Sequence, residues 1–449
     1  MRLVPTMLLA CLLPTLTLLP GGEAHACGGC FQGIQETEST QVSGHRMILS
    51  ISPDRTTLWD QIRYVGNPSS FAWVLPVKGM AEVGLSSDAL FANLELQTGV
   101  TVRSPEVSCP PPPFCESSSA FTATSGGGDS EGGWTGVTVV AQKVVGPYET
   151  VQLSSQDPGA IEAWLVGHGY TISDEAAPIL TTYVAEGFDF LALKLVPGGD
   201  VQSMRPVRVT TTGAGTALPL RMVAIGAGAK VPISLWVLGE GRYQPANFDW
   251  FTIQQVNLVW DWDTSKSNYE ALVQEGFAAS AGTSWLVEAA EPFSRLPITN
   301  GLVELAMNDP ARSGYADEDG NGALLSCAED LDALFGSIDM STLWVSRLRG
   351  DLAHDTLTSD LMLEASATQG VVKRDFTAPD WIGSAPSCPS YPPCNDAGSG
   401  SGSGGASGSA GKSGCTIHQG DRSSAALSGL VLAALGLAAV RRRRGWRVR

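Results

Sequence analysis

The stretch FAWVLPVKGMAEVGLSSDALFANL, residues 71–94, holds a clear strand pattern and a clear helix start side by side. Alternating apolar side chains at residues 71–77 predict a strand with one buried face. Serines and an aspartate at residues 86–88 then supply a helix N-cap. Apolar residues follow at helical spacing: Leu90, Phe91 and Leu94. A strand and an amphipathic helix this close together indicate a fold that mixes both elements.

Outward from this stretch, strand and helix patterns continue to alternate irregularly. Upstream, residues 45–51 and 58–64 read as strands that would form a β-meander with residues 71–77. Downstream helices are predicted at 157–168, 173–187, 269–279 and 327–335. Downstream strands are predicted at 137–145, 188–196, 207–212, 218–225, 232–238, 284–288, 343–348 and 358–365. We therefore expect an α+β body that is mixed and strand-rich, with several short helices.

Composition divides the 449 residues into four parts. Residues 1–26 combine Arg2, an apolar stretch and the Ala24-His25-Ala26 cleavage pattern of a signal peptide, so signal peptidase would cut after Ala26. Residues 27–395 form the exported body, with a sub-boundary in the Pro-, Ser- and Gly-rich loop at 104–135. Residues 396–414 are a Gly/Ser-rich disordered linker. Residues 415–449 form a tail.

Seven of the nine cysteines lie in the exported body. In an oxidising compartment they are disulfide candidates: Cys27, Cys30, Cys109, Cys115, Cys327, Cys388 and Cys394. SCPPPPFC (108–115) and SCPSYPPC (387–394) have the same five-residue gap, so each loop could close locally, or the two loops could pair with each other. The Cys27–Cys30 pair lacks the strand-to-helix setting of a redox motif, and no histidine spacing suggests zinc.

Several blocks resemble one bacterial family. They are ACGGCF (26–31), residues 71–94, IEAWLVGHGYTISDEAAPILTTYVAEGFDFLALKL (161–195), NYEALV (268–273), SWLVEAA (284–290) and LWVSRLRGDL (343–352). Together they resemble the domain-of-unknown-function 2330 family, mostly exported proteins of myxobacteria and their relatives. The resemblance implies export but transfers no catalytic residue.

The strongest metal-site candidate is DEDGNG, residues 317–322. Asp317, Asp319 and Asn321 match the first half of a calcium loop, where alternate oxygen ligands converge on the ion. The twelfth position is Ala328 instead of the expected glutamate, so a solvated acidic turn is the competing interpretation. We expect no other cofactor.

Aromatic and histidine residues give weaker signals. Trp250, Trp260 and Trp262 alternate with aspartates at 249, 261 and 263, a pattern that fits an exposed binding surface. His45, His168 and His354 lie far apart in sequence, and no HExxH pair, nucleophile elbow or dinucleotide loop is present. His168 falls at the end of a predicted helix, where a structural role is expected. We therefore expect a protein that is not an enzyme.

The tail joins Cys415 to a hydrophobic helix at about 425–440 and then to Arg441–Arg444. An apolar helix of this length spans a bilayer only marginally, and the arginines would stay on the cytoplasmic side. The order of these features resembles the MYXO-CTERM sorting tag. That resemblance implies cleavage near Cys415 by a membrane-embedded sorting protease, and lipid attachment to this cysteine. Anchorage would then be through the helix or the lipid.

The formal net charge of −17 disfavours nucleic acid and anionic lipid as partners. Taken together, these features predict an exported protein anchored at the cell surface, with a structural or interaction role at the envelope. The alternative is an extracellular binding module for glycan, peptide or calcium. An envelope enzyme is the least favoured class.

Overall fold

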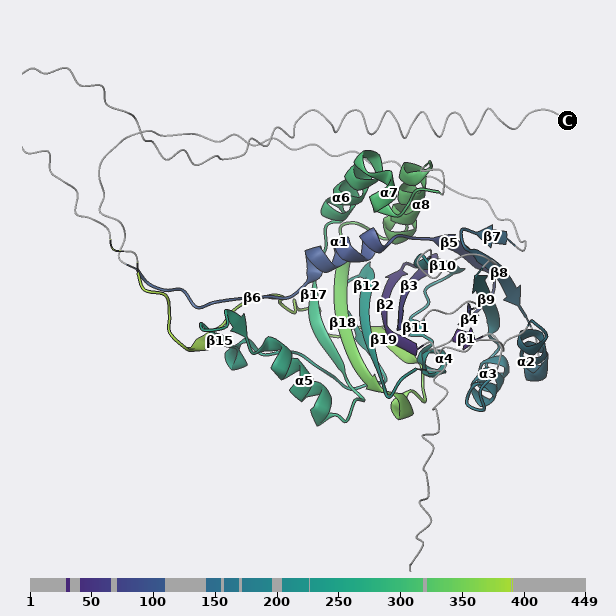
Figure 1. Ribbon diagram of the computed structural model, residues 1–449, viewed down its shortest axis with the longest axis horizontal. Coiled ribbons are helices and arrows are strands. Elements are labelled where there is room, and N and C mark those ends of the chain that lie inside the picture. Colours follow the sequence, from purple (N-terminus) through teal and green to yellow (C-terminus); the bar gives the residue numbers. More distant parts are fainter. Residues whose placement is uncertain are drawn as a thin grey trace, which may run out of the picture. The chain divides into compact units, whose positions relative to one another are not determined.

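The computed structural model describes residues 30–32, 41–65, 71–109, 143–154, 157–168, 172–195, 204–225, 227–317, 321–388 and 390. These residues belong to one compact unit, Met1–Pro111 with Ser118–Ser390. They form the mixed, strand-rich body expected from the sequence (Figure 1). The predicted signal peptide, linker and C-terminal helix lie outside them. Within the described ranges, no helix is long and apolar enough to cross a membrane.

An eight-stranded sheet is the largest element of the body. Its strands run in the order β14 (Trp250–Phe251), β17 (Trp285–Pro292), β18 (Leu343–Ala353), β12 (Lys230–Glu240), β2 (Gln41–Ile51), β3 (Arg55–Val65), β10 (Val207–Thr212) and β5 (Ala81–Leu85). Neighbours are antiparallel except for the β12–β2 and β14–β17 pairs, which are parallel. The strand order shows that most neighbouring strands in this sheet come from segments that are distant in sequence.

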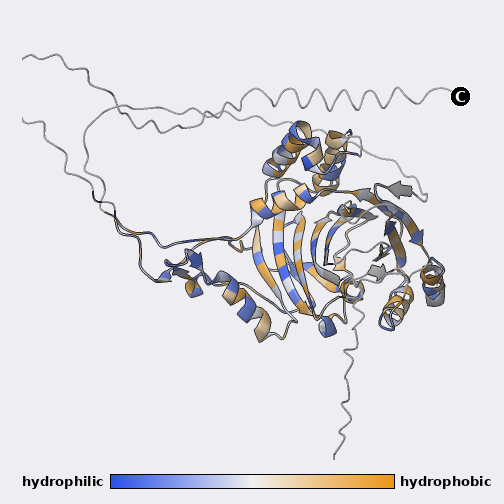
Figure 2. Cartoon of the chain, viewed as in Figure 1, coloured by the Kyte–Doolittle hydropathy of each residue, from blue (hydrophilic) through white to orange (hydrophobic). Residues whose placement is uncertain are grey.

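Both faces of this sheet are buried. In β2, Ile48 packs into one hydrophobic cluster while Met47 and Leu49 pack into another on the opposite face. In β12, Trp236 packs into the same cluster as Ile48, and Leu235 packs into the cluster on the opposite face. Burial on both faces explains the short apolar runs at 47–49 in β2 and 235–238 in β12. Figure 2 shows orange bands alternating with blue ones along the strands of the body.

Helices α1 (Asp88–Thr98), α6 (Arg295–Asn308), α7 (Pro310–Ser313) and α8 (Ala323–Phe335) lie beside one face of the sheet in Figure 1. Ser87 begins α1 as predicted, because its side chain accepts a hydrogen bond from the Ala89 amide. Leu90, Phe91 and Leu94 are buried and pack with the sheet. The opening stretch thus fixes one layer of the core.

A second sheet has five antiparallel strands, and it corrects the predicted meander. Its order is β1 (Cys30–Gln32), β4 (Phe71–Val77), β9 (Asp189–Leu195), β8 (Tyr148–Leu153) and β7 (Lys143–Val145). The third predicted meander strand, β4, pairs with β9 and not with β3. The reason is burial: Trp73, Leu75 and Val77 form a cluster with Val207 and Val209 of the larger sheet, which requires β4 to lie in a facing layer.

Helices α2 (Pro158–Gly167) and α3 (Ala176–Ala185) occur where the sequence predicts them and pack on the five-stranded sheet. The predicted strand at 218–225 is wrong. It folds as the short β11 (Ala217–Leu218) and the helix α4 (Leu220–Ala224). A short apolar run that is buried all round has no periodicity to separate strand from helix.

The remaining strands form small sheets. One contains β11, β19 (Leu361–Ala365) and β13 (Tyr243–Pro245). A second contains β16 (Lys266–Ser267), β15 (Val259–Asp261) and β21 (Asp380–Ile382), and a third contains β20 (Asp375–Thr377) and β6 (Thr101–Arg103). The second and third of these sheets surround a separate small core together with η2 (Gln255–Asn257) and α5 (Tyr269–Ala279). This core is built on Leu258, Phe376 and Ala378.

Candidate functional site

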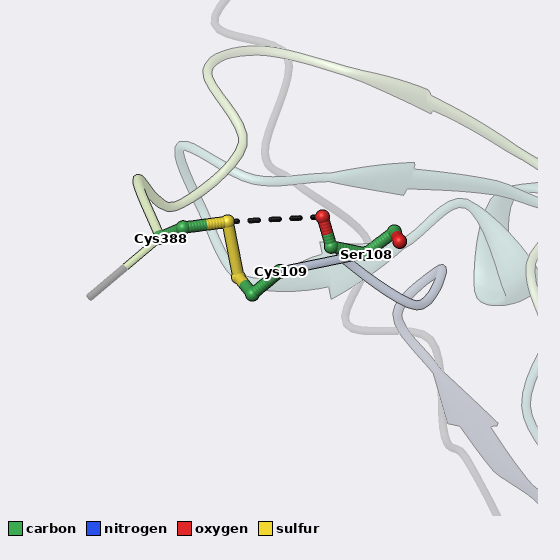
Figure 3. Close-up of a disulfide and its surroundings, with 3 residues drawn as sticks. All are labelled: Ser108, Cys109 and Cys388. Atoms are coloured by element: carbon green, nitrogen blue, oxygen red, sulfur yellow. Dashed lines mark hydrogen bonds between the residues drawn. A yellow bond between two sulfur atoms is a disulfide. The ribbon is translucent and has the colours of Figure 1, made fainter. Parts of the chain in front are cut away.

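A disulfide joins the two Cys-Pro loops at their first cysteines. Cys109 and Cys388 are bonded, with Cα atoms 5.3 Å apart, although 279 residues separate them in sequence. Figure 3 shows the Cys388 sulfur beside the Ser108 carbonyl oxygen, 3.8 Å away. The body is therefore disulfide-braced, as expected, and the bond closes a very long loop.

Of the two alternatives that the sequence left open, this bond is the pairing between the loops, and it excludes Cys109 with Cys115 and Cys388 with Cys394. The cause is the parallel pairing of β6 with β20, continued by a hydrogen bond from the Ala378 amide to the Arg103 carbonyl. Parallel strands send both loops out in the same direction, so their first cysteines meet. Cys27, Cys115, Cys394, Ala26 and Cys415 lie outside the described residues, and of Cys30 only the backbone is described.

Cys327 is a buried free thiol in α8. Burial, helped by the nearby Asp330 carboxylate, raises the pKa of this thiol to about 12. A thiol that stays protonated at neutral pH is a poor nucleophile and a poor metal ligand. Cys327 therefore serves packing.

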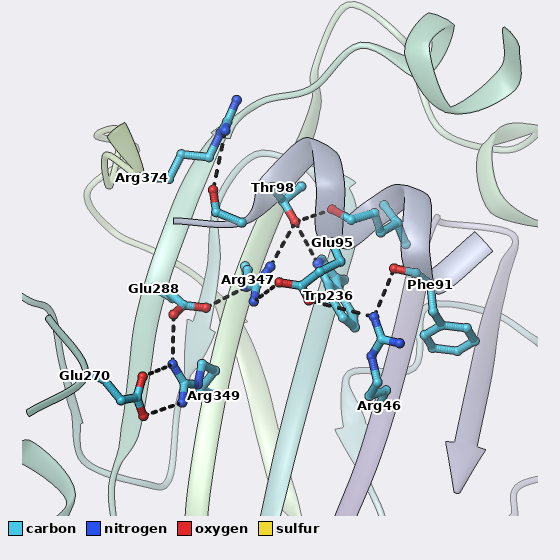
Figure 4. A network of polar contacts seen from close by, with 12 residues as sticks. Arg46, Phe91, Glu95, Thr98, Trp236, Glu270, Glu288, Arg347, Arg349 and Arg374 are labelled. Carbon is cyan, nitrogen blue, oxygen red and sulfur yellow. Dashed lines mark hydrogen bonds and ion pairs between the residues drawn. The ribbon is translucent and has the colours of Figure 1, made fainter. Parts of the chain in front are cut away.

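An ion network lies between α1, the larger sheet and α5 (Figure 4). Arg347 on β18 donates to Glu288 on β17 at 2.5 Å and to Glu95 on α1 at 2.8 Å. Arg349 donates to Glu288 at 3.2 Å and also binds Glu270 on α5. Because the Arg347 and Glu288 side chains are only 7% and 3% exposed, this pair is shielded from water. The network connects two helices to the sheet.

A second buried cluster is centred on Asp330, whose residue is 1% exposed. Its carboxylate accepts hydrogen bonds from four side chains: Trp59 at 2.7 Å, Ser86 at 2.5 Å, Arg208 at 3.1 Å and Tyr315 at 2.7 Å. A buried carboxylate with this many donors is fully solvated by the protein. The cluster has the character of a structural bridge between α8 and the strands.

The three body histidines stay apart, as their sequence spacing indicates. The buried His45 places Nδ1 3.1 Å from both oxygens of Asp60. His168 is the C-cap of α2, as predicted, and stacks on Trp164 with ring centroids 4.0 Å apart. The Nε2 atom of His354 lies 3.0 Å from the Ala224 carbonyl oxygen. Each histidine thus has a local structural contact.

Asp317 and Asn321, the described residues at the two ends of 317–321, are hydrogen-bonded to each other. The Asp317 carboxylate accepts from the Asn321 amide at 2.6 Å, and the Asp317 amide donates to the Asn321 carbonyl at 2.9 Å. Asp319 lies outside the described residues, and among those that are described no three His, Cys, Asp or Glu side chains gather as a metal site. Calcium binding by this loop stays a prediction.

The predicted tryptophan surface is divided in two. Trp250 belongs to β14 of the large sheet, whereas Trp260 and Trp262 lie in and just after β15, with ring centroids 6.1 Å apart. Strand pairing places Trp381 opposite Trp260. Trp381 could not be predicted as part of this group, because a single aromatic residue in a short strand 121 positions from Trp260 shows no pattern with the others.

Comparisons with known proteins identify a family. The family described as "Uncharacterized protein conserved in bacteria (DUF2330)" matches residues 22–301, more than half of the chain. No curated protein matches. Among solved structures, the crystal structure of baculovirus P35 is similar at 6% identity with a TM-score of 0.27, over 46% of this chain and 66%, just under two thirds, of that chain. A TM-score this low supports no inference about fold or function.

Proposed function

The chain belongs to the DUF2330 family of uncharacterised bacterial proteins, and on that premise we propose that it is an exported, non-catalytic protein held at the cell surface. Its role would be structural, or interaction with other envelope components. The observation that carries the proposal is the Cys109–Cys388 disulfide. Such bonds persist in oxidising compartments outside the cytoplasm, which supports the export that residues 1–26 predict.

The polar clusters support a structural role over catalysis. Glu288 is held by two arginines and Asp330 by four donors, so neither carboxylate is available to act as a general base. The Cys327 thiol is likewise protected by burial. The buried reactive groups thus hold layers of the fold together.

Surface anchorage is proposed from the tail. Signal peptidase would release Cys27 as the new N-terminus, and a membrane-embedded protease would cut near Cys415, leaving the protein attached through lipid on that cysteine or through the 425–440 helix. The linker at 396–414 would hold the body away from the membrane.

The test is mass spectrometry of both mature ends, combined with protease shaving of intact cells. We expect a chain beginning at Cys27, ending near Cys415, and accessible from outside. A Cys415→Ala variant should lose processing, whereas the matched Ser413→Ala variant should be processed normally. A chain that retains both Met1 and Arg449, or one that fractionates with the cytoplasm, would overturn the proposal.

A further inference from the structure

One of the two arginines that are buried among the described residues has no anionic partner there. Arg242 is 7% exposed and Arg347 is 6% exposed. Arg347 donates to the carboxylates of Glu288 and Glu95. The Arg242 guanidinium makes one hydrogen bond within the described ranges, from Nη1 to the Gly370 carbonyl oxygen at 3.2 Å, and its buried Nε atom makes none. The fold therefore supplies an anion to one buried arginine and not to the other.

The unpaired charge of Arg242 is energetically unfavourable. A guanidinium has five N–H donors and keeps its positive charge in proteins. Burial lowers the pKa of Arg242, and no charged group in the described part of the chain opposes that effect. Buried charges in proteins are normally paired or hydrogen-bonded, because the loss of hydration is otherwise uncompensated. An anion that reached this guanidinium would supply both the opposite charge and the acceptors.

The backbone of Arg242 is held in place by the loop after β19. Its amide donates to the Gln369 carboxamide oxygen at 2.6 Å, and its carbonyl accepts from the Ser366 amide at 2.8 Å. Residues 367–371 of this loop are exposed, so the guanidinium, which donates to one of their carbonyls, lies close beneath the surface. A donor group that is already positioned loses little entropy when it binds a ligand.

The Trp250 indole lies beside the guanidinium. The Arg242 Cζ atom is 5.5 Å from the centroid of the Trp250 ring, which makes a cation–π contact. Trp250 is 39% exposed, so part of its surface is open to solvent next to the buried charge. Tryptophan combines a large apolar area with an aromatic face on which other flat groups pack. An anion bound here would therefore place its apolar part against the indole.

The charge of the site selects the class of anion. Arg242 contributes one positive charge, and no second charged group acts on it among the described residues. A carboxylate balances that charge, and its two oxygens match the planar N–H fork of a guanidinium. Sulfate or phosphate would leave excess negative charge in a poorly hydrated position, in a chain whose formal net charge is already −17. The site therefore favours a monoanion.

We infer that Arg242 binds the carboxylate of a small organic acid, and that the Trp250 indole packs on the apolar part of the same molecule. The carboxylate would accept from Nη2, which makes no hydrogen bond within the described ranges. This inference adds a ligand site to the structural role proposed above. It does not depend on export or anchorage, so its failure and the failure of the proposed function are separate results.

The experiment is isothermal titration of the purified full chain with sodium benzoate, with neutral benzamide and with sodium sulfate. We expect benzoate to bind, and benzamide and sulfate to bind at least about tenfold more weakly. Arg242→Gln should weaken benzoate binding by about tenfold or more, because a carboxamide carries no charge. Trp250→Ala should weaken the binding of benzoate but not that of acetate, which has no ring to pack on the indole.

Arg374→Gln is the matched control. The Arg374 side chain is 26% exposed and already donates to Glu291 at 2.7 Å, so its loss should leave benzoate binding at the wild-type level. Melting temperatures without ligand check the folding of each variant. Arg242→Gln should melt no lower than wild type, since it removes an unpaired buried charge.

Three results would overturn the carboxylate site. They are no binding of benzoate to the wild-type chain, binding of benzamide as tight as that of benzoate, and tighter binding of sulfate than of benzoate. A fourth result would assign Arg242 a packing role alone: a lower melting temperature for Arg242→Gln together with unchanged benzoate binding.

Discussion

At the scale of single residues, the body depends on charged groups that water does not reach. Arg347 and Glu288 are almost fully buried, and each has a second charged partner, Glu95 and Arg349 respectively. Removing two charges from water is costly, and only close, well-oriented hydrogen bonds offset that cost. Such a network stabilises little overall, but it strongly penalises the loss of any one member.

We therefore expect Glu288→Ala to lower the free energy of unfolding by about 3–5 kcal/mol, since it leaves Arg347 buried beside only one partly exposed carboxylate. The measurement is urea denaturation followed by circular dichroism. Asp375→Ala is the matched control. It breaks an ion pair to Arg103 whose side chains are 47% and 68% exposed, and it should cost at most about 1 kcal/mol. Equal losses for the two variants would contradict this account.

The Ser87 side chain makes two hydrogen bonds. Its oxygen caps α1 by accepting from the Ala89 amide, and its hydroxyl donates to the buried Ser313 carbonyl. We expect Ser87→Ala to destabilise the protein by about 2 kcal/mol, the upper end of the range for a cap, because the Ser313 carbonyl also loses a partner. Ser294→Ala removes only an exposed cap on α6 and should cost about 1 kcal/mol or less in the same urea titration. A larger loss of unfolding free energy for Ser294→Ala than for Ser87→Ala would show that the hydrogen bond from Ser87 to the Ser313 carbonyl adds no stability.

At the scale of elements, the pairing of β6 with β20 determines which cysteines meet. Residues 101–103 run parallel to residues 375–377 there, and the disulfide lies just beyond both strands. A bond that closes so long a loop restricts the unfolded chain strongly.

We expect Cys388→Ser to lower the free energy of unfolding by about 2–5 kcal/mol under non-reducing conditions. Peptide mapping of the wild-type protein without reduction should yield a peptide pair linked through Cys109 and Cys388. Cys327→Ser is the control for loss of a cysteine that forms no disulfide, and it should leave that peptide pair intact. Recovery of a Cys109–Cys115 peptide would show that the loops close locally.

At the scale of the whole molecule, several acidic groups are buried in their neutral form. Burial raises the pKa of Tyr183, Tyr269 and Tyr315, each with a carboxylate nearby that adds to the effect, and raises that of Cys327 to about 12. These groups come from separate helices and loops. Their titration therefore reports on the integrity of the entire body.

The stability that these groups confer is complete at neutral pH and is lost as pH rises. In the unfolded chain, tyrosine ionises near pH 10 and cysteine near pH 8.5, whereas the folded protein keeps both protonated to higher pH. The free energy of unfolding should therefore fall above about pH 9, by about 1.4 kcal/mol per group for each pH unit beyond its unfolded pKa. Urea midpoints at pH 7.5 and 10.5 measure this fall. Equal midpoints would mean that the tyrosines ionise normally.

Much of the secondary structure could be predicted because single elements carry their own signals. Caps and apolar spacing located α1, α2 and α3, and alternation located β4. The helix α6 was missed, because Gly301 interrupts its pattern. A Cβ atom at that position would come within 2.8 Å of the Asn93 side chain. The close contact between α6 and α1 therefore explains why residue 301 is a glycine.

The sequence by itself indicated most of the helices and strands and a disulfide in the body, since these depend on local composition and on the redox compartment. Only the tertiary structure decided partners: β4 with β9, Cys109 with Cys388, and Trp260 with Trp381. Each of these pairs joins segments more than a hundred residues apart. Burial of both faces of one sheet and the parallel course of short strands set such pairings, and neither leaves a periodic trace along the chain.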